Sequence, residues 1–318
     1  MRSELELLTV GRISVDLYAE QVGVGLRGIR SFRKSVGGTA TNVAVAAARL
    51  GHRAAVFTRV GDDAFGVEVR RALAEDFAVD TRFIGIDPEL PTPLALATME
   101  DPDEPHLVFY RAPQAPDMMI RSADVDRAVV ETVPILWFPT SCLSAEPSRT
   151  TIHDLLEWRR RRAQTVLDLD WRPMFWPDEA AATAALDRVL DCVTMTIGNR
   201  AECAVAVGES DPDRAADALL ERGLAAAIVK LGGDGVLVAT ADGERQRIAP
   251  YPVDVLCGLG AGDAFGGALC HGLLSGWDLA TAARAGNAAG AVVASRLMCA
   301  DDMPDRADID ALMAAGEA

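Results

Sequence analysis

A glycine-rich segment in the last quarter of the chain gives the strongest indication of chemistry. The segment Gly258-Leu-Gly-Ala-Gly-Asp-Ala-Phe-Gly-Gly follows a strand-like run at 252–256 and opens an apolar helical pattern at 261–274. Glycines let a backbone approach an anion closely, and the free N–H groups and dipole of a helix N-terminus favour negative charge there. The segment therefore predicts an anion-binding loop.

Asp263 lies in the first turn of that helix and allows two interpretations. It is an N-terminal charge that stabilises the helix dipole, or it is a base that takes a proton from a hydroxyl attacking a bound phosphate. The glycines also resemble a dinucleotide-binding turn, but that turn needs a strand ending in Asp or Glu about 20 residues later. A second helical pattern follows here instead, which argues against a dinucleotide. The chain also lacks the P-loop and protein-kinase motifs.

Four further polar or glycine-rich clusters each lie where a strand is expected to end or a helix to begin. They are Gly37-Gly38 through Asn42, Asp168 through Arg172, Asn199 through Glu202, and Lys230 through Gly235. The paired glycines are simple turn residues in one interpretation. In the other they let a polar ligand lie against bare backbone while Asn42 offers it a donor and an acceptor. Glycines of ordinary turns would fall at either end of the strands, so the clustering favours a ligand site.

Strand-like and helical patterns alternate along most of the chain. Strands are expected at 5–15, 53–60, 134–138, 165–169, 193–197 and 226–231, and helices at 39–50, 65–77, 148–162, 261–274, 279–294 and about 309–314. This rhythm predicts an α/β fold with a doubly wound, mainly parallel sheet, helices on both faces and ligands at the carboxyl ends of the strands. The chain is expected to form one domain over 1–318.

Two segments, about 16–34 and 93–111, interrupt this rhythm. In the second, Leu94-Ala-Leu-Ala-Thr and His106-Leu-Val-Phe-Tyr flank the turn-rich 101–105, which predicts a hairpin. The two segments together would form a small sheet over the mouth of the larger one. The alternative is a pair of surface loops.

Composition excludes several classes of protein. Half of the 318 residues are apolar, which excludes a disordered chain, and the formal charge of −16 argues against partners such as nucleic acid or an anionic membrane. The six cysteines form no C-x-x-C pair, and no zinc or redox motif is visible. The acidic N-terminus does not resemble a signal peptide, and no apolar stretch reaches membrane-spanning length. These features predict a reduced, cytoplasmic protein.

Together these motifs resemble the ribokinase-like (PfkB) family of carbohydrate kinases over about residues 7–304. The first family signature is similar to Gly37-Gly38 through Gly51, the D-x-N-x-R segment to Asp168 through Arg172, the N-x-x-E motif to Asn199 through Glu202, the K-x-G-x-x-G segment to Lys230 through Gly235, and the G-A-G-D signature to Gly260 through Asp263. The resemblance implies an ATP-dependent phosphoryl transfer to a primary hydroxyl, with the two interrupting segments as a lid.

The resemblance also assigns roles to residues. It implies that Asp263 is the catalytic base and that the N–H groups of Gly260, Ala261 and Gly262 stabilise charge on the transferred phosphoryl group. It implies that the sugar is bound by Asp16, Gly37, Gly38, Asn42 and Asp168. The nucleotide would be bound by Asn199, Glu202, Lys230, Gly232, Gly235 and Asn287. Glu202 would organise Mg²⁺, largely through water.

Several segments are most similar to family members that phosphorylate 5-dehydro-2-deoxygluconate in inositol catabolism: 11–18, 110–116, 168–176 and 258–272. Such a keto acid needs a cation for its carboxylate, and the candidates are Arg111, Arg172 and Arg12. Each of the three could instead form an ordinary salt bridge. Other family substrates, 2-keto-3-deoxygluconate or fructose, remain alternatives, as does a non-catalytic sugar or nucleotide sensor.

The chain departs from the family pattern at three places. Cys257-Gly-Leu replaces the usual D-T-T before the G-A-G-D signature, and Met298-Cys299 replaces a small G-A pair, which puts activation by a monovalent cation in doubt. Asp170 replaces the common Asn, and this pure acceptor is expected to disfavour a second anion. An exposed lid edge would pair with a second copy, so a homo-oligomer, a dimer through the lid, is expected.

Overall fold

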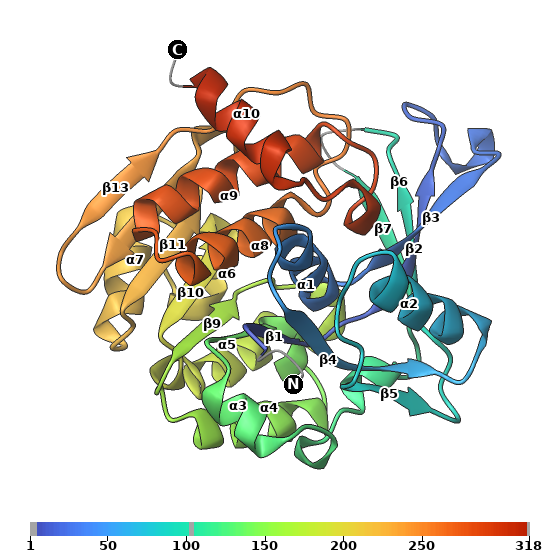
Figure 1. Cartoon of the computed structure of the whole chain (residues 1–318), viewed down its shortest axis with the longest axis horizontal. Coiled ribbons are helices and arrows are strands. Elements are labelled where there is room, and N and C mark those ends of the chain that lie inside the picture. Colours follow the sequence, from blue (N-terminus) through green and yellow to red (C-terminus); the bar gives the residue numbers. More distant parts are fainter. Residues whose placement is uncertain (1–4, 102–104, 317–318) are drawn as a thin grey trace.

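The computed structural model describes residues 5–101 and 105–316, and it contains a large sheet and a small one (Figure 1). The large sheet has the order β13-β12-β11-β10-β9-β8-β1-β4-β5. Its strands are β1 (Leu7–Val10), β4 (Ala54–Gly61), β5 (Ile84–Asp87), β8 (Ile135–Pro139), β9 (Gln164–Asp168), β10 (Met195–Asn199), β11 (Ala226–Lys230), β12 (Val236–Thr240) and β13 (Arg245–Ile248). All neighbours pair in parallel except at β12 and β13. The expected doubly wound α/β fold is confirmed.

Helices cover both faces of the large sheet because its strands are apolar on both sides. In β8, Ile135 and Trp137 join one core cluster while Leu136 and Phe138 join the other, as the pleat requires. One face packs against α1 (Thr39–Arg49), α2 (Ala64–Glu75), α8 (Ala261–Leu274), α9 (Leu279–Ala294) and α10 (Arg306–Gly316). The other packs against α3 (Arg127–Thr132), α4 (Ser148–Arg159), α5 (Glu179–Asp187), α6 (Arg200–Val207) and α7 (Pro212–Glu221).

The two interrupting segments come together in the small sheet. Its order is β3-β2-β6-β7, built from β2 (Ser14–Ala19), β3 (Phe32–Gly37), β6 (Leu94–Thr98) and β7 (His106–Tyr110). β6 and β7 pair antiparallel, so the expected hairpin is confirmed, although its turn at 102–104 lies outside the described residues. The alternative of two surface loops is wrong. Figure 1 shows this sheet to the side of the large one, near α1 and α2.

Two expected strands are wrong in detail. The run at 5–15 is divided between the two sheets, because β1 ends at Val10 and Gly11 has a φ of +140°. A Cβ at Gly11 would lie 2.8 Å from Cys142 Sγ, so only glycine fits this bend. No strand forms over 252–256; this segment is irregular, and the N–H of Leu256 bonds to the carbonyl of Ala294 on α9. The helix expected at 148–162 ends at Arg159, since Arg160 and Arg161 have positive φ.

The described part of the chain contains no helix that is long and apolar enough to span a membrane. All six cysteines in it are free thiols, and only Cys192 is not buried.

Candidate active site

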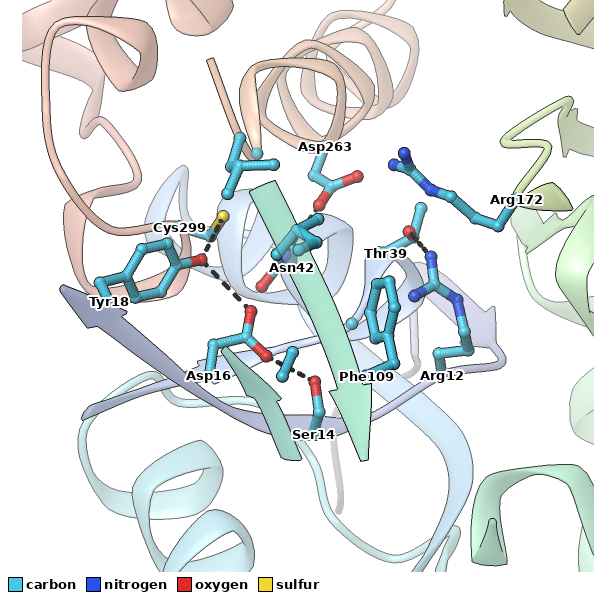
Figure 2. Close-up of a pocket in the computed structure, with 15 residues that line it drawn as sticks. Arg12, Ser14, Asp16, Tyr18, Thr39, Asn42, Phe109, Arg172, Asp263 and Cys299 are labelled. Atoms are coloured by element: carbon cyan, nitrogen blue, oxygen red, sulfur yellow. Dashed lines mark hydrogen bonds between the residues drawn. The ribbon is translucent and has the colours of Figure 1, made fainter. Parts of the chain in front are cut away.

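Two pockets meet at the N-terminus of α8. The first, called here the polar pocket, has a volume of about 50 Å³ and is drawn in Figure 2. It is lined by Arg12, Ser14, Asp16, Tyr18, Gly38, Thr39, Asn42, Ala95, Leu107, Phe109, Arg172, Leu259, Gly260, Asp263 and Cys299. These residues come from the small sheet, from α1, from the segment after β9 and from the start of α8, so the pocket exists only once both sheets are in place.

Asp263 projects into this pocket from the first turn of α8 (Figure 2). Its Oδ2 accepts a hydrogen bond of 2.7 Å from Nδ2 of Asn42 on α1. Burial raises the pKa of Asp263 to about 6, and the bond from Asn42 acts in the opposite direction. A carboxylate whose pKa lies just below neutral pH is ionised at pH 7 and still basic enough to accept a proton in catalysis.

Asp16 marks the opposite end of the polar pocket in Figure 2. Its carboxylate accepts hydrogen bonds from Ser14 Oγ at 2.7 Å and from Tyr18 OH at 3.2 Å, and burial raises its pKa. Gly37 makes room for it, because a Cβ there would lie 2.0 Å from Asp16 Oδ2. The neighbouring Gly38 has a φ of +100° and lies against the Arg12 carbonyl, so Gly38 is required by the local backbone and Gly37 by the Asp16 side chain.

Two arginines lie on another side of the pocket and share one carboxylate. Asp170 Oδ2 accepts a 2.6 Å bond from Arg12 Nη2 and a 2.9 Å bond from Thr39 Oγ1. Asp170 Oδ1 forms an ion pair with Arg172 Nε at 2.8 Å. Burial alone would raise the pKa of Asp170, but these two guanidinium groups hold it well below its usual range. The negative charge of Asp170 is thus paired with two positive charges, those of Arg12 and Arg172.

The two arginines differ in how much of the guanidinium group is free to bind a ligand. Arg12 is 5% exposed, and its guanidinium is engaged by Ser141, Thr39 and Asp170. The Arg172 side chain is 39% exposed and extends toward Asp263 in Figure 2. Arg172 therefore has more freedom to meet a ligand, whereas Arg12 chiefly holds the wall of the pocket.

Arg111 does not line the polar pocket. Its guanidinium forms bonds of 2.6 and 3.1 Å with the buried carboxylate of Asp117, which also accepts the N–H of Ile13. Arg111 lies in an adjacent groove and stacks on Phe175, with a distance of 5.0 Å from its guanidinium carbon to the ring centroid. Phe109 of β7 lines both cavities and packs edge-on against Phe175, so this aromatic pair lies where the two cavities adjoin.

The second pocket, called here the glycine pocket, has a volume of about 450 Å³ and lies on the other side of the α8 N-terminus. It is lined by Lys230, Gly232, Gly233, Gly235, Pro250, Tyr251, Pro252, Val253, Val255, Ala261, Gly262, Phe265, Gly286, Asn287, Gly290, Ala291 and Ala294. Asn287 is anchored there by a 3.0 Å bond from Nδ2 to the Ala249 carbonyl. The predicted Lys230, Gly232, Gly235 and Asn287 are thus brought together in one pocket.

Lys230 connects this pocket to a group of buried carboxyl groups. Its Nζ lies 3.8 Å from Glu202 Oε2 and 3.3 Å from the position that a Cβ would take on Gly262. Burial would lower the pKa of Lys230, but Glu202 and Asp168 raise it above its usual value. Burial also raises the pKa of Asp168 to about 8, and Asp168 Oδ1 accepts the N–H of Asp170. Asp168 lines neither pocket and supports the loop that carries Asp170.

Asn199 and Glu202 form a capping box at the start of α6. Asn199 Oδ1 accepts the Glu202 N–H at 2.9 Å, and Glu202 Oε2 accepts the Asn199 N–H at 2.7 Å. Neither residue lines the glycine pocket, although Glu202 reaches its edge through Lys230. Among the described residues no group of three His, Cys, Asp or Glu side chains is placed to hold a metal ion.

Sequence reasoning missed several residues that line the polar pocket, among them Ser14, Tyr18, Thr39, Phe109 and Cys299. A signal existed for two of them, because Ser14 and Tyr18 flank Asp16 at the two-residue spacing that puts strand side chains on one face. Cys299 gave none. Its thiol packs against Gly260 and lies 2.8 Å from Tyr18 OH, contacts that join distant parts of the chain.

Comparison with known proteins identifies the family of the chain that forms these two pockets. The model described as pfkB family carbohydrate kinase matches residues 4–306. The chain belongs to the PfkB family of carbohydrate kinases. The kinase is 31% identical, over 98% of its length and 96% of the relative's, to a protein of Bacillus cereus named 5-dehydro-2-deoxygluconokinase 2. It is 30% identical, with the same coverage, to the 5-dehydro-2-deoxygluconokinase of Bacillus anthracis.

Solved structures agree with the fold of the kinase. A fructokinase from Vibrio cholerae O395 with fructose, ADP and potassium ion bound has a TM-score of 0.85 at 25% identity, covering 98% of this chain and 100% of that one. A putative ribokinase II from E. coli in complex with ATP and Mg²⁺ has a TM-score of 0.88 at 23% identity, covering 98% and 99%. The kinase therefore has the ribokinase-like fold.

Proposed function

We propose that this kinase transfers the terminal phosphoryl group of ATP to the primary hydroxyl of a keto sugar acid, and that the acid is 5-dehydro-2-deoxygluconate, converted to its 6-phosphate in inositol catabolism. The observation that carries the proposal is the position of Asp263 at the helix N-terminus that separates the polar pocket from the glycine pocket. The names of the Bacillus relatives support the choice of acid.

The reaction follows from that position. The substrate hydroxyl gives its proton to Asp263 as its oxygen forms a bond to the terminal phosphorus, while the bond from that phosphorus to the bridging oxygen breaks and ADP leaves with the electron pair. Negative charge develops on the transferred group. The N–H groups of Gly260, Ala261 and Gly262, together with the dipole of α8, stabilise it.

The two ends of the polar pocket bind different groups of the substrate: hydroxyl groups at one end and the carboxylate at the other. Asp16, with Asn42 and the backbone of Gly38, accepts and positions hydroxyl groups, while Gly37 acts indirectly by making room for the Asp16 carboxylate. Arg172 takes the carboxylate, because its guanidinium carries charge into the pocket and is only partly engaged by Asp170. Arg12 adds positive potential beside it. Arg111 would have to leave Asp117 to reach the same ligand.

ATP occupies the glycine pocket in this proposal, with its base among the apolar side chains and its phosphates directed toward Gly262 and Lys230. Mg²⁺ accompanies the phosphates and neutralises their charge. Glu202 suits an outer role for that ion: one of its oxygens is bonded to Asn199 N–H, and the other can hold a metal-bound water. Buried thiols at Cys257 and Cys299 offer no hard oxygen ligand, so a monovalent cation is not part of the proposal.

The small sheet acts as a lid in this proposal. It carries Asp16 on β2 and Phe109 on β7 into the polar pocket, and closing it over the substrate would keep water from ATP. β7 is an edge strand of the sheet, and its pairing with a second copy would give a dimer. We place the kinase in the cytoplasm, where free thiols persist, as one domain with 16–34 and 93–111 as its lid segments.

A coupled assay for ADP release tests the proposed substrate with 5-dehydro-2-deoxygluconate, 2-keto-3-deoxygluconate, fructose and ribose. The expected result is the highest kcat/KM with the first acid. A higher kcat/KM with 2-keto-3-deoxygluconate or fructose would assign the kinase to that substrate instead. Binding of ATP without transfer to any member of a wider panel of sugar acids would support a sensor and overturn the proposal.

A further inference from the structure

The amide of Asn42 is bonded at one end and unused at the other. The side chain is 3% exposed, and its Nδ2 donates to Asp263 Oδ2 at 2.7 Å. Its Oδ1 is buried and has no hydrogen-bond partner within residues 5–101 and 105–316. Buried acceptors are rarely left unbonded, because losing water without a replacement partner costs stability. An unbonded acceptor that lines a ligand pocket therefore points to a donor on the ligand.

The orientation of this amide is fixed by its neighbours. If the amide were turned over, its oxygen would face the Asp263 carboxylate, placing two acceptors together. The backbone that carries it cannot easily move, because Asn42 N–H bonds to the Gly38 carbonyl and Thr41 Oγ1 donates to the Arg12 carbonyl. In the view of Figure 2, Asn42 lies between the carboxyl groups of Asp263 and Asp16.

We propose that Asn42 is the positioning residue of the catalytic base. Its Nδ2 holds Oδ2 of Asp263 so that the other carboxylate oxygen faces the reacting hydroxyl, while its Oδ1 accepts a hydrogen bond from a second hydroxyl of the same substrate. One amide thus fixes the position of the substrate relative to the base. This inference rests on the proposed function, since it requires Asp263 to accept the proton.

The bond from Asn42 also acts on the proton affinity of the base. Burial raises the pKa of Asp263 to about 6, and the Asn42 bond is the strongest influence in the opposite direction. The other charged or titratable groups that line the pocket with Asp263 or act on it electrostatically are Arg12, Asp16, Tyr18, Asp168, Asp170, Arg172, Lys230 and Cys299. All of them remain when Asn42 alone is changed. Losing the Asn42 bond must therefore raise the pKa further, and the base must then be protonated up to a higher pH.

The test is the pH dependence of kcat/KM for the best sugar acid between pH 5 and pH 9. Wild-type kcat/KM should rise with pH through an acid limb near pH 6, where Asp263 ionises. Asn42→Ala should move that limb upward by about one pH unit. Asn42→Asp, which has the same shape, should move it further, because two like charges then share one site. Asp16→Asn is the matched control: it should raise KM for the sugar and leave the limb in place.

An acid limb that stays in place in Asn42→Ala, whatever the loss of turnover, would overturn the inference and leave Asn42 as a substrate contact only. The Asp263→Asn variant separates this failure from that of the proposed function. Loss of turnover in Asp263→Asn with an unmoved limb overturns the positioning role alone. Retained turnover in Asp263→Asn overturns both, because there is then no base to position. Thermal unfolding identifies a misfolded Asn42→Ala, and Asn42→Leu, which also removes the bond to Asp263 without adding a charge, then carries the test.

Discussion

The polar pocket and the glycine pocket lie on either side of one helix N-terminus and are built on opposite principles. The polar pocket is small, at about 50 Å³, and its wall includes many charged and hydrogen-bonding side chains, which come from the small sheet, α1, the start of α8 and loops that follow the large sheet's strands. The glycine pocket is larger, at about 450 Å³, and much of its wall is glycine, alanine and proline. Side chains select by charge and donor pattern, whereas bare backbone accommodates phosphates and flat apolar groups. Selection between substrates is therefore expected on the side of the polar pocket.

The largest effect expected is that of Asp263→Asn, which removes the proposed base at the boundary between the two pockets. Turnover should fall by at least about 10²-fold, the usual scale for a positioned acid or base. ATP affinity should persist, because the glycine pocket and its N–H groups are unchanged. Steady-state kinetics and ATP binding by calorimetry measure the two quantities. Near-normal turnover would show that the proton leaves by another route.

The next effect concerns the arginine side of the polar pocket. Arg172→Ala should raise KM for the keto acid by about 10-fold to 100-fold, the range for losing a hydrogen bond to a charged group, and change KM for fructose far less. Arg172→Lys, which keeps the charge, should give a KM for the keto acid between those of the wild type and Arg172→Ala. Arg111→Ala should have a smaller effect on KM than Arg172→Ala, because Arg111 pairs with Asp117 outside the pocket. Equal effects of Arg172→Ala on both substrates would place the carboxylate elsewhere.

The smallest effect expected comes from filling the glycine pocket. Ala291 lines it from α9, and Ala291→Phe should raise KM for ATP by about tenfold through steric crowding while leaving KM for the sugar acid unchanged. Ala291→Ser is the control for a change of similar position and small size. A parallel rise in both Michaelis constants would mean that the two pockets do not act as separate units.

Much of the scaffold follows from local patterns. The helices expected at 261–274 and 279–294 have the bounds of α8 and α9, because long apolar runs of helical period are strong local signals. The irregular segment at 252–256 resembles a strand in sequence, since an apolar run alone does not show whether a neighbouring strand exists to pair with it. β12 and β13 escape prediction for the converse reason: they form an antiparallel edge outside the alternating rhythm.

The candidate site is predictable where a motif carries the function, and it is not where the tertiary contacts do. The glycines and Asp263 can be located because a helix N-terminus has a local signature. The pairing of Arg111 with Asp117 cannot, because both cations and carboxylates are abundant and only the folded chain shows which ones meet. Cys299 is the extreme example, as its thiol reaches Tyr18 across 281 positions of sequence.

The small sheet supplies Asp16 and Tyr18 from β2, Ala95 from β6, and Leu107 and Phe109 from β7 to the wall of the polar pocket, and none of these lines the glycine pocket. The strands that form one wall of the polar pocket are thus separate from the residues that line the glycine pocket. Exchanging 14–37 and 94–110 for the segments of a relative should therefore change recognition of the acceptor's hydroxyl groups, while Arg172, which lies outside both segments, keeps the preference for a carboxylate. In evolutionary terms, the same division lets substitutions in the four strands of the small sheet alter acceptor recognition without altering the residues that line the glycine pocket.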